Sequence, residues 1–151
     1  RFPSNSYFFP RLMDYYTAHG DNEEALDVVN RVLEMNDTSR LYLYAKSTVL
    51  FNMGSYDECI ALSDTLIKWN DSIPDPYYNA GTSYLNKALK LHPLREKKQL
   101  RATYQKARPY MERYRQLAPD QKQKWGPALY RIYLNLNMGR QFDEIDRLLK
   151  Q

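Results

Sequence analysis

The chain contains a single cysteine, two histidines and five glycines among its 151 residues. One cysteine, Cys59, cannot form a disulfide within the chain, so cysteine usage does not indicate the redox compartment. His19 and His92 lie far apart, and no H-E-x-x-H or C-x-x-C spacing brings metal ligands together. The few glycines form neither a P-loop nor a Rossmann pattern. These absences predict no metal site, no cofactor and no enzymatic activity.

Long apolar runs are also missing from the chain. No stretch approaches the roughly 20 apolar residues that span a bilayer, and no signal sequence opens the chain. We therefore expect a soluble protein without a membrane span. The chain begins at Arg1 without a methionine, which suggests that a segment precedes it, and a periplasmic and a cytoplasmic location are both open.

The chain does have enough apolar residues for one shared core. It is 43% hydrophobic and 26% charged, the composition of a folded domain rather than of a disordered segment. Apolar residues recur at helical spacing, whereas the alternation with period two that marks strands is absent over any length. The sequence predicts an all-α fold and a single domain over residues 1–151.

Two segments of the chain resemble each other at a spacing of 34 residues. HGDNEEALDVVNRVLEMND (residues 19–37) aligns with MGSYDECIALSDTLIKWND (residues 53–71), and Gly20 and Gly54 keep this spacing. Each glycine follows an apolar stripe of helical period and can take the positive φ that ends a helix. Acidic residues just after each glycine suit the N-terminal dipole of a second helix. Each segment therefore belongs to a helix-turn-helix unit.

At these offsets the repeat resembles the tetratricopeptide repeat (TPR) family, in the form of a bacterial TPR scaffold. YYNAGTSYL (77–85) is similar to the first helix of such a repeat, and ARPYMERYRQLAP (107–119) is similar to the second. The resemblance implies a right-handed α-solenoid of about four units, each a pair of helices. The expected units are residues 7–37, 41–71, 75–119 and 122–151.

The third unit holds a surplus of 14 residues between its two helices. Seven residues added to each helix would keep the two apolar faces in phase. We therefore expect an elongated helical hairpin, with the insertion near residues 87–106 and its turn near His92 and Pro93. In the fourth unit, Gly139 is expected to end the first helix.

Charge is distributed unevenly along the chain. Residues 14–75 hold twelve Asp and Glu against four Lys and Arg, whereas residues 87–131 hold thirteen Lys and Arg against three acids. The hairpin tip is suited to contact an acidic partner, or the acidic end of a second copy. Its candidate residues are Arg95, Lys97, Lys98 and Arg101. Nucleic-acid binding is not expected, because the aromatic residues lie mostly in the helix seams.

In the TPR family, the first helices of successive repeats line a concave groove that holds an extended peptide or a helix of the partner. The repeat frame places Tyr, Thr and Asn on this face at the same 34-residue step. The expected groove residues are Tyr44, Thr48, Asn52, Tyr78, Thr82, Asn86, Tyr130 and Asn137. Asparagine amides can pair with both kinds of peptide backbone group, and tyrosine adds flat contact area. Because these places hold no lysine or arginine, a clamp for a C-terminal carboxylate is not expected.

These observations favour a non-enzymatic scaffold that binds a protein or peptide in its groove. The alternative is a self-assembling structural module, in which the acidic N-terminal end of one molecule meets the basic hairpin of the next. The sequence does not identify a particular partner.

Overall fold

The computed structural model of this protein describes residues 22–35 and 40–151. Both ranges are built from α-helices joined by short connections, and neither contains a strand. The helices are α2 (Asn22–Met35), α3 (Arg40–Asn52), α4 (Tyr56–Trp69), α5 (Asp75–Leu89), α6 (Lys97–Leu117), α7 (Lys122–Asn135) and α8 (Gly139–Leu149). The prediction of an all-α fold is therefore confirmed. Much of the predicted first unit, including Gly20, lies outside the described residues.

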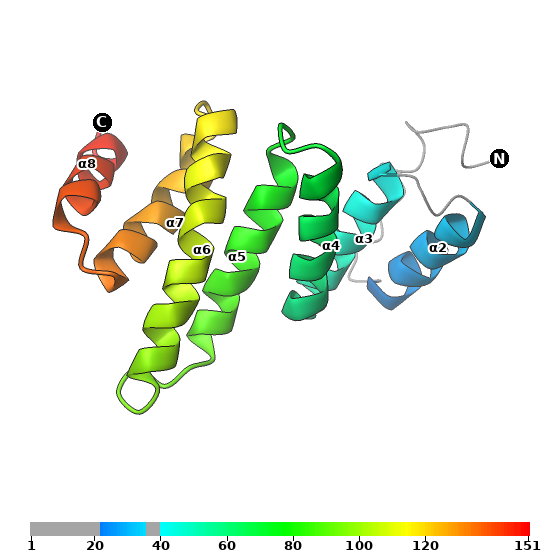
Figure 1. The fold of residues 1–151 in the computed structure, drawn as a ribbon, viewed down its shortest axis with the longest axis horizontal. Coiled ribbons are helices and arrows are strands. Elements are labelled where there is room, and N and C mark those ends of the chain that lie inside the picture. The colour runs from blue at the N-terminus through cyan, green and yellow to red at the C-terminus, as the bar shows by residue number, and fades with distance from the viewer. Residues whose placement is uncertain (1–21, 36–39) are drawn as a thin grey trace.

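The helices follow one another in a row, from α2 at one end to α8 at the other (Figure 1). Each helix contacts the next, so that α3 and α4, α5 and α6, and α7 and α8 form three hairpins, which we call the second, third and fourth hairpin after the predicted units. In addition, α3 contacts α5, and α5 contacts α7, which places the first helices of the three hairpins in one layer. None of the helices in these two ranges is both long and apolar enough to cross a membrane.

The first turns of α2, α4 and α5 carry residues that favour a helix start. Glu23 and Asp57 stand in the first turns of α2 and α4, where the positive end of the helix dipole favours an acid. Pro76 stands at the start of α5, where a backbone N–H would have no partner within the helix, so the N–H that proline lacks is not missed there. The first turn of α6 differs, because it contains Lys97 and Lys98 and no acid. This helix therefore begins with like charges near its own positive end.

The end of α3 has the geometry that the sequence predicts. Gly54 has a φ of 82°, the left-handed conformation that costs glycine little. The N–H of Ser55 donates to the carbonyl oxygen of Leu50 at 2.8 Å, and the N–H of Gly54 donates one turn back along α3. This pattern satisfies the last carbonyls of the helix and turns the chain into α4.

The end of α7 has the same geometry, but at a different residue from the one predicted. Asn137 has a φ of 56°, and the N–H of Met138 donates to the carbonyl oxygen of Tyr133 at 2.9 Å. Asparagine tolerates the left-handed conformation better than other residues with a side chain. Gly139 instead begins α8. The prediction that Gly139 ends the first helix of this hairpin is therefore wrong.

The insertion in the third hairpin lengthens mainly its second helix. With 21 residues, α6 is seven residues longer than α4, which has 14. With 15 residues, α5 exceeds the 13 residues of α3 by only two. Residues 90–96 form the connection at the hairpin tip. The expectation that both helices gain seven residues is wrong for α5, although the hairpin is elongated and turns at the predicted place.

Proline chemistry accounts for the early end of α5. The residue before a proline is disfavoured in the helical conformation, which favours an end of α5 before His92 and Pro93. The His92 ring then caps the turn, because its Nδ1 accepts the N–H groups of Leu94 at 3.2 Å and Arg95 at 3.1 Å. In return, the N–H of His92 donates to Glu96 Oε1 at 3.0 Å. His92 therefore has a structural role at the tip.

The apolar seam predicted between the helices of this hairpin forms the centre of the larger core. Its buried members include Tyr77, Gly81, Ala88, Tyr104, Ala107, Met111 and Tyr114. At Gly81 the two helices are so close that an added Cβ would lie 2.8 Å from Met111 Cε. The core continues from α6 into α7 and α8, where Leu129 and Ile145 are fully buried. A smaller cluster joins α2 to α3 around Val29 and Tyr42.

Two tyrosine–carboxylate hydrogen bonds tie the helices together at the edge of this core. The Tyr110 hydroxyl donates to Asp64 on α4 at 2.6 Å, and the Tyr133 hydroxyl donates to Glu112 on α6. Burial, together with the bond to Asp64, raises the pKa of Tyr110. Burial and Glu112 raise the pKa of Tyr133 in the same way. Both phenols therefore stay protonated and remain donors well above neutral pH.

The left-handed turn at Gly54 leads to the first prediction. Gly54→Ala is expected to lower the free energy of unfolding by about 1–2 kcal/mol, the cost of a side chain in that conformation. The loss comes from the backbone alone, because no atom lies within 4 Å of an added Cβ. Urea denaturation followed by circular dichroism measures it. Gly139→Ala is the control, because Gly139 has open space and no positive φ, and an equal loss there would contradict the argument.

Candidate functional site

A hollow of about 440 Å³ lies on the layer formed by α3, α5 and α7. Its volume is within the range of about 300–1,000 Å³ that is typical of ligand pockets. We call it the first-helix groove, since every residue around it belongs to the first helix of a hairpin. Its lining residues are Phe51, Tyr78, Thr82, Leu85, Asn86, Gln123, Lys124, Pro127, Ala128 and Arg131.

The part of the predicted groove on α5 lies where the sequence places it. Tyr78, Thr82 and Asn86 follow one another along α5 and all line the first-helix groove. The Tyr78 ring is half-buried against Tyr114, with 5.0 Å between the ring centroids. Burial raises the pKa of Tyr78, so its hydroxyl stays protonated. The Thr82 hydroxyl donates to the Tyr78 carbonyl oxygen at 2.6 Å, which leaves it only an acceptor toward the groove.

The predicted residues on α3 have three different surroundings. Tyr44 lies beside a separate hollow of about 290 Å³, between α3 and the start of α5. Thr48 accepts a hydrogen bond from Asn79 Nδ2 at 3.4 Å, in the contact between the two helices. Asn52 is exposed at the end of α3, and its neighbour Phe51 lines the groove instead. Among these three, none lines the first-helix groove.

The fourth hairpin contributes different residues from those predicted, because its register is shifted. The turn geometry makes Asn137, and not Gly139, the equivalent of Gly54. Counting back from these two turn residues, the residues of α7 that match Tyr44, Thr48 and Asn52 of α3 are Pro127, Arg131 and Asn135. Pro127 and Arg131 line the groove. An alignment that takes Gly139 as the turn residue does not place Pro127 and Arg131 on the groove face.

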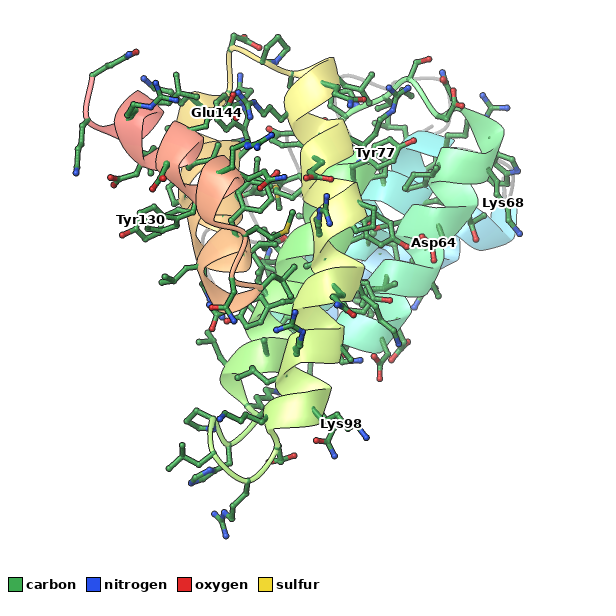
Figure 2. The ribbon with its side chains drawn as sticks, turned by 60° about the vertical axis from the view of Figure 1, so that its left-hand side comes forward. Asp64, Lys68, Tyr77, Lys98, Tyr130 and Glu144 are labelled. Atoms are coloured by element: carbon green, nitrogen blue, oxygen red, sulfur yellow. The ribbon has the colours of Figure 1, made fainter. Side chains whose placement is uncertain are left out.

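The two residues predicted in this hairpin lie elsewhere. Tyr130 packs against Phe142 of α8, with 4.7 Å between the ring centroids. Figure 2 shows Tyr130 at the edge of α7 and α8, on the side away from α5. Asn137 is in the turn between α7 and α8. The structure therefore brings neither side chain to the first-helix groove.

Two basic residues of α7 do reach the groove, which corrects the expectation that it carries no lysine or arginine. Lys124 and Arg131 both line it, and no aspartate or glutamate does so among the described residues. Trp125, Leu129 and Ile132 point into the core, which turns the side of α7 that carries the two cations toward α5. The absence of cations therefore no longer argues against acidic ligands.

Arg131 is the most firmly held of these side chains. Its Nε donates to the Tyr104 hydroxyl at 2.9 Å, and its Nη2 donates to the Leu85 carbonyl oxygen at 2.8 Å. The guanidinium carbon also lies 5.5 Å from the centroid of the Tyr104 ring. One side chain of α7 therefore connects α5 and α6, and its Nη1 takes part in neither bond. Lys124 is held more loosely, with its Nζ 5.4 Å from the centroid of the Tyr78 ring.

Three of the four predicted basic residues line a second hollow, of about 700 Å³, between the hairpin tip and the end of α7. We call it the corner cleft. Its lining residues are Pro93, Lys97, Lys98, Leu100, Arg101, Tyr104, Asn135 and Asn137. Lys98 lies near the tip in Figure 2. Arg95 is exposed in the connection at the tip and does not line the cleft.

The residues that the structure describes do not assemble into a metal site. No group of three or more His, Cys, Asp or Glu side chains in those ranges is close enough to hold a metal ion. Cys59 is buried, its Sγ lies 3.9 Å from the Asn79 carbonyl oxygen, and burial raises the pKa of its thiol. It therefore packs as a small core residue.

Comparison with known proteins shows the fold. No protein-family model matches the chain, and no curated protein matches it by sequence. Among solved structures, the chain is similar to the crystal structure of TTC0263, a thermophilic TPR protein of Thermus thermophilus. The match has a TM-score of 0.71 at 16% sequence identity, and it covers 96% of this chain and 71% of that one. The chain therefore has a TPR-like helical repeat fold.

Proposed function

We propose that this protein is a non-enzymatic scaffold that binds an extended peptide segment of a partner protein in the first-helix groove. A TPR-like fold presents the first helices of its hairpins as one continuous surface, and that layer carries the groove. The partner segment lies across α5 and α7.

The observation that carries this proposal is the unused hydrogen-bonding capacity of Asn86. Its side chain lines the groove and is half-buried, yet its amide makes no hydrogen bond to any described residue. An asparagine amide offers donors and an acceptor together, which suits the unpaired N–H and C=O groups of an extended backbone. A ligand backbone beside Asn86 supplies the missing partners.

The charge of the groove defines the ligand further. Lys124 and Arg131 lie on its α7 side, and none of its lining residues is acidic. Tyr78, Phe51 and Leu85 supply apolar contact area between these polar groups. The arrangement favours a segment with an apolar residue and at least one carboxylate over a basic segment, which would meet like charge.

A change at Asn86 tests the proposal. A displayed random-peptide library is first selected on the purified chain, and the selected peptide is measured by calorimetry. Asn86→Ala is expected to weaken its binding by about 1–1.5 kcal/mol, the worth of a hydrogen bond left unmade, while thermal stability stays the same. Gln105→Ala, an exposed change on α6 outside the groove, is the control. Lower stability with unchanged affinity would show that Asn86 is structural and would overturn the proposal.

A further inference from the structure

We propose that the corner cleft is a second binding site, which takes the carboxylate side chains of an acidic segment of a partner protein. It is separate from the first-helix groove, and its argument does not depend on that groove. The insertion in the third hairpin creates it. Because α6 is seven residues longer than α4, the tip projects beyond the end of α7 and forms an inner corner (Figure 1).

Three unpaired cations form one wall of the cleft. Lys97, Lys98 and Arg101 line it, and none of them makes an ion pair with an acid in the described ranges. Glu96 is the nearest acid along the chain, but its Oε1 accepts the backbone N–H of His92. The lining contains no carboxylate, so the cations have no partner within the cleft. An acidic segment would supply one for each.

A buried hydroxyl group points to a ligand as well. Tyr104 lines the cleft although it is only 5% exposed. Its oxygen accepts the Nε–H of Arg131 at 2.9 Å, so its own hydrogen is available to donate. Within the described part of the chain, that hydrogen has no acceptor. A phenol that accepts a bond from a guanidinium group is a stronger donor, and a carboxylate is the acceptor that satisfies it best.

The start of α6 adds to the same positive potential. Lys97 and Lys98 occupy its first turn, where the helix dipole favours an acid, and no side chain caps this end. Bound carboxylates would relieve the repulsion that this arrangement creates. On the opposite wall, the amides of Asn135 and Asn137 offer groups that pair with a peptide backbone.

The cleft is better suited to an acidic protein segment than to nucleic acid. Single strands bind by stacking their bases on exposed aromatic rings. Tyr104 is the only aromatic side chain in the lining. It is buried, and its hydroxyl accepts a hydrogen bond from Arg131. The remaining apolar contacts come from Pro93 and Leu100, which present no flat ring face for a base.

The experiment uses the full chain and a fluorescein-labelled octaglutamate peptide as the probe, with binding followed by fluorescence anisotropy at low salt. The variant carries Lys97→Gln, Lys98→Gln and Arg101→Gln and is expected to bind about tenfold more weakly. The charge-matched control carries Lys68→Gln, Lys106→Gln and Arg147→Gln, three exposed cations outside the cleft, and is expected to bind like the wild type. Asn86→Ala is expected to leave octaglutamate binding unchanged, which separates this site from the groove.

Several results would overturn the proposal. One is no binding of octaglutamate by the wild type, and another is an equal loss in the variant and its control, which would show a response to net charge alone. Tighter, cleft-dependent binding of an oligothymidine would assign the cleft to nucleic acid. Salt-sensitive dimers in sedimentation that disappear in the cleft variant would make a second copy the occupant. Unchanged thermal melting of the variant confirms that lost binding is not lost folding.

Discussion

Leu129→Asp is expected to lower the free energy of unfolding by more than about 4 kcal/mol. Leu129 is fully buried on α7, within the core that continues from α6 into α8. A carboxylate there would lose its hydration without gaining a cation or a hydrogen-bond donor. The change also removes an apolar side chain that fills its site completely. Urea denaturation followed by circular dichroism measures the loss.

The same helix offers a matched control for this change. Leu134 is five residues further along α7 and is 53% exposed. Leu134→Asp introduces the same carboxylate into water instead of into the core, and we expect it to change stability by less than about 0.5 kcal/mol. Similar losses from both changes would mean that α7 does not pack through the face that carries Leu129.

Arg131→Met is expected to lower the free energy of unfolding by about 2–3 kcal/mol and to weaken binding in the first-helix groove. The guanidinium group makes hydrogen bonds to the Tyr104 hydroxyl and the Leu85 carbonyl oxygen, which join α7 to α6 and α5. Methionine keeps much of the apolar stem but none of the donors, so both oxygens lose a charged partner. Denaturation measures the first effect, and calorimetry with the selected peptide measures the second.

Arg131→Lys separates the charge of this residue from its geometry. A lysine keeps the positive charge but has a single ammonium group, which cannot reproduce two bonds in the fixed planes of a guanidinium. We expect it to retain part of the peptide affinity while losing most of the stability that Arg131→Met loses. If Lys restores full stability, the two hydrogen bonds are not what joins these helices, and charge alone accounts for the role of Arg131.

The predictions that held rest on local patterns. The seam from Tyr77 to Tyr114 follows helical spacing in the sequence, and its residues are buried between α5 and α6. The positive φ of Gly54 follows from the glycine at the end of an apolar stripe. Tyr78, Thr82 and Asn86 of α5 line the first-helix groove, because the frame for that helix came from several matching residues instead of from one glycine. Their role in binding stays a prediction.

The predictions that failed depend on which residue ends a helix and on how one helix faces the next. Both Asn137 and Gly139 can follow α7, and the pattern of apolar residues does not distinguish a turn at one from a turn at the other. A shift of this kind rotates the assigned face of α7, so that Tyr130 and Asn137 stand in the expected groove in place of Pro127 and Asn135. The way in which the insertion divides between α5 and α6 was also predicted wrongly. Pro93 limits the length of α5 on one side of the tip, whereas it does not limit α6 on the other side.

Helix spacing, glycine and proline positions and the unequal distribution of charge are properties of neighbouring residues, and they were sufficient for the all-α class, the elongated hairpin and its basic tip. The contacts that define the candidate sites join residues far apart in the chain. Arg131 meets Leu85 and Tyr104, and the cations of the tip face Asn135 and Asn137, only because α7 packs against α5 and α6. These contacts depend on how whole helices pack against one another, and no local pattern in the sequence specifies that packing.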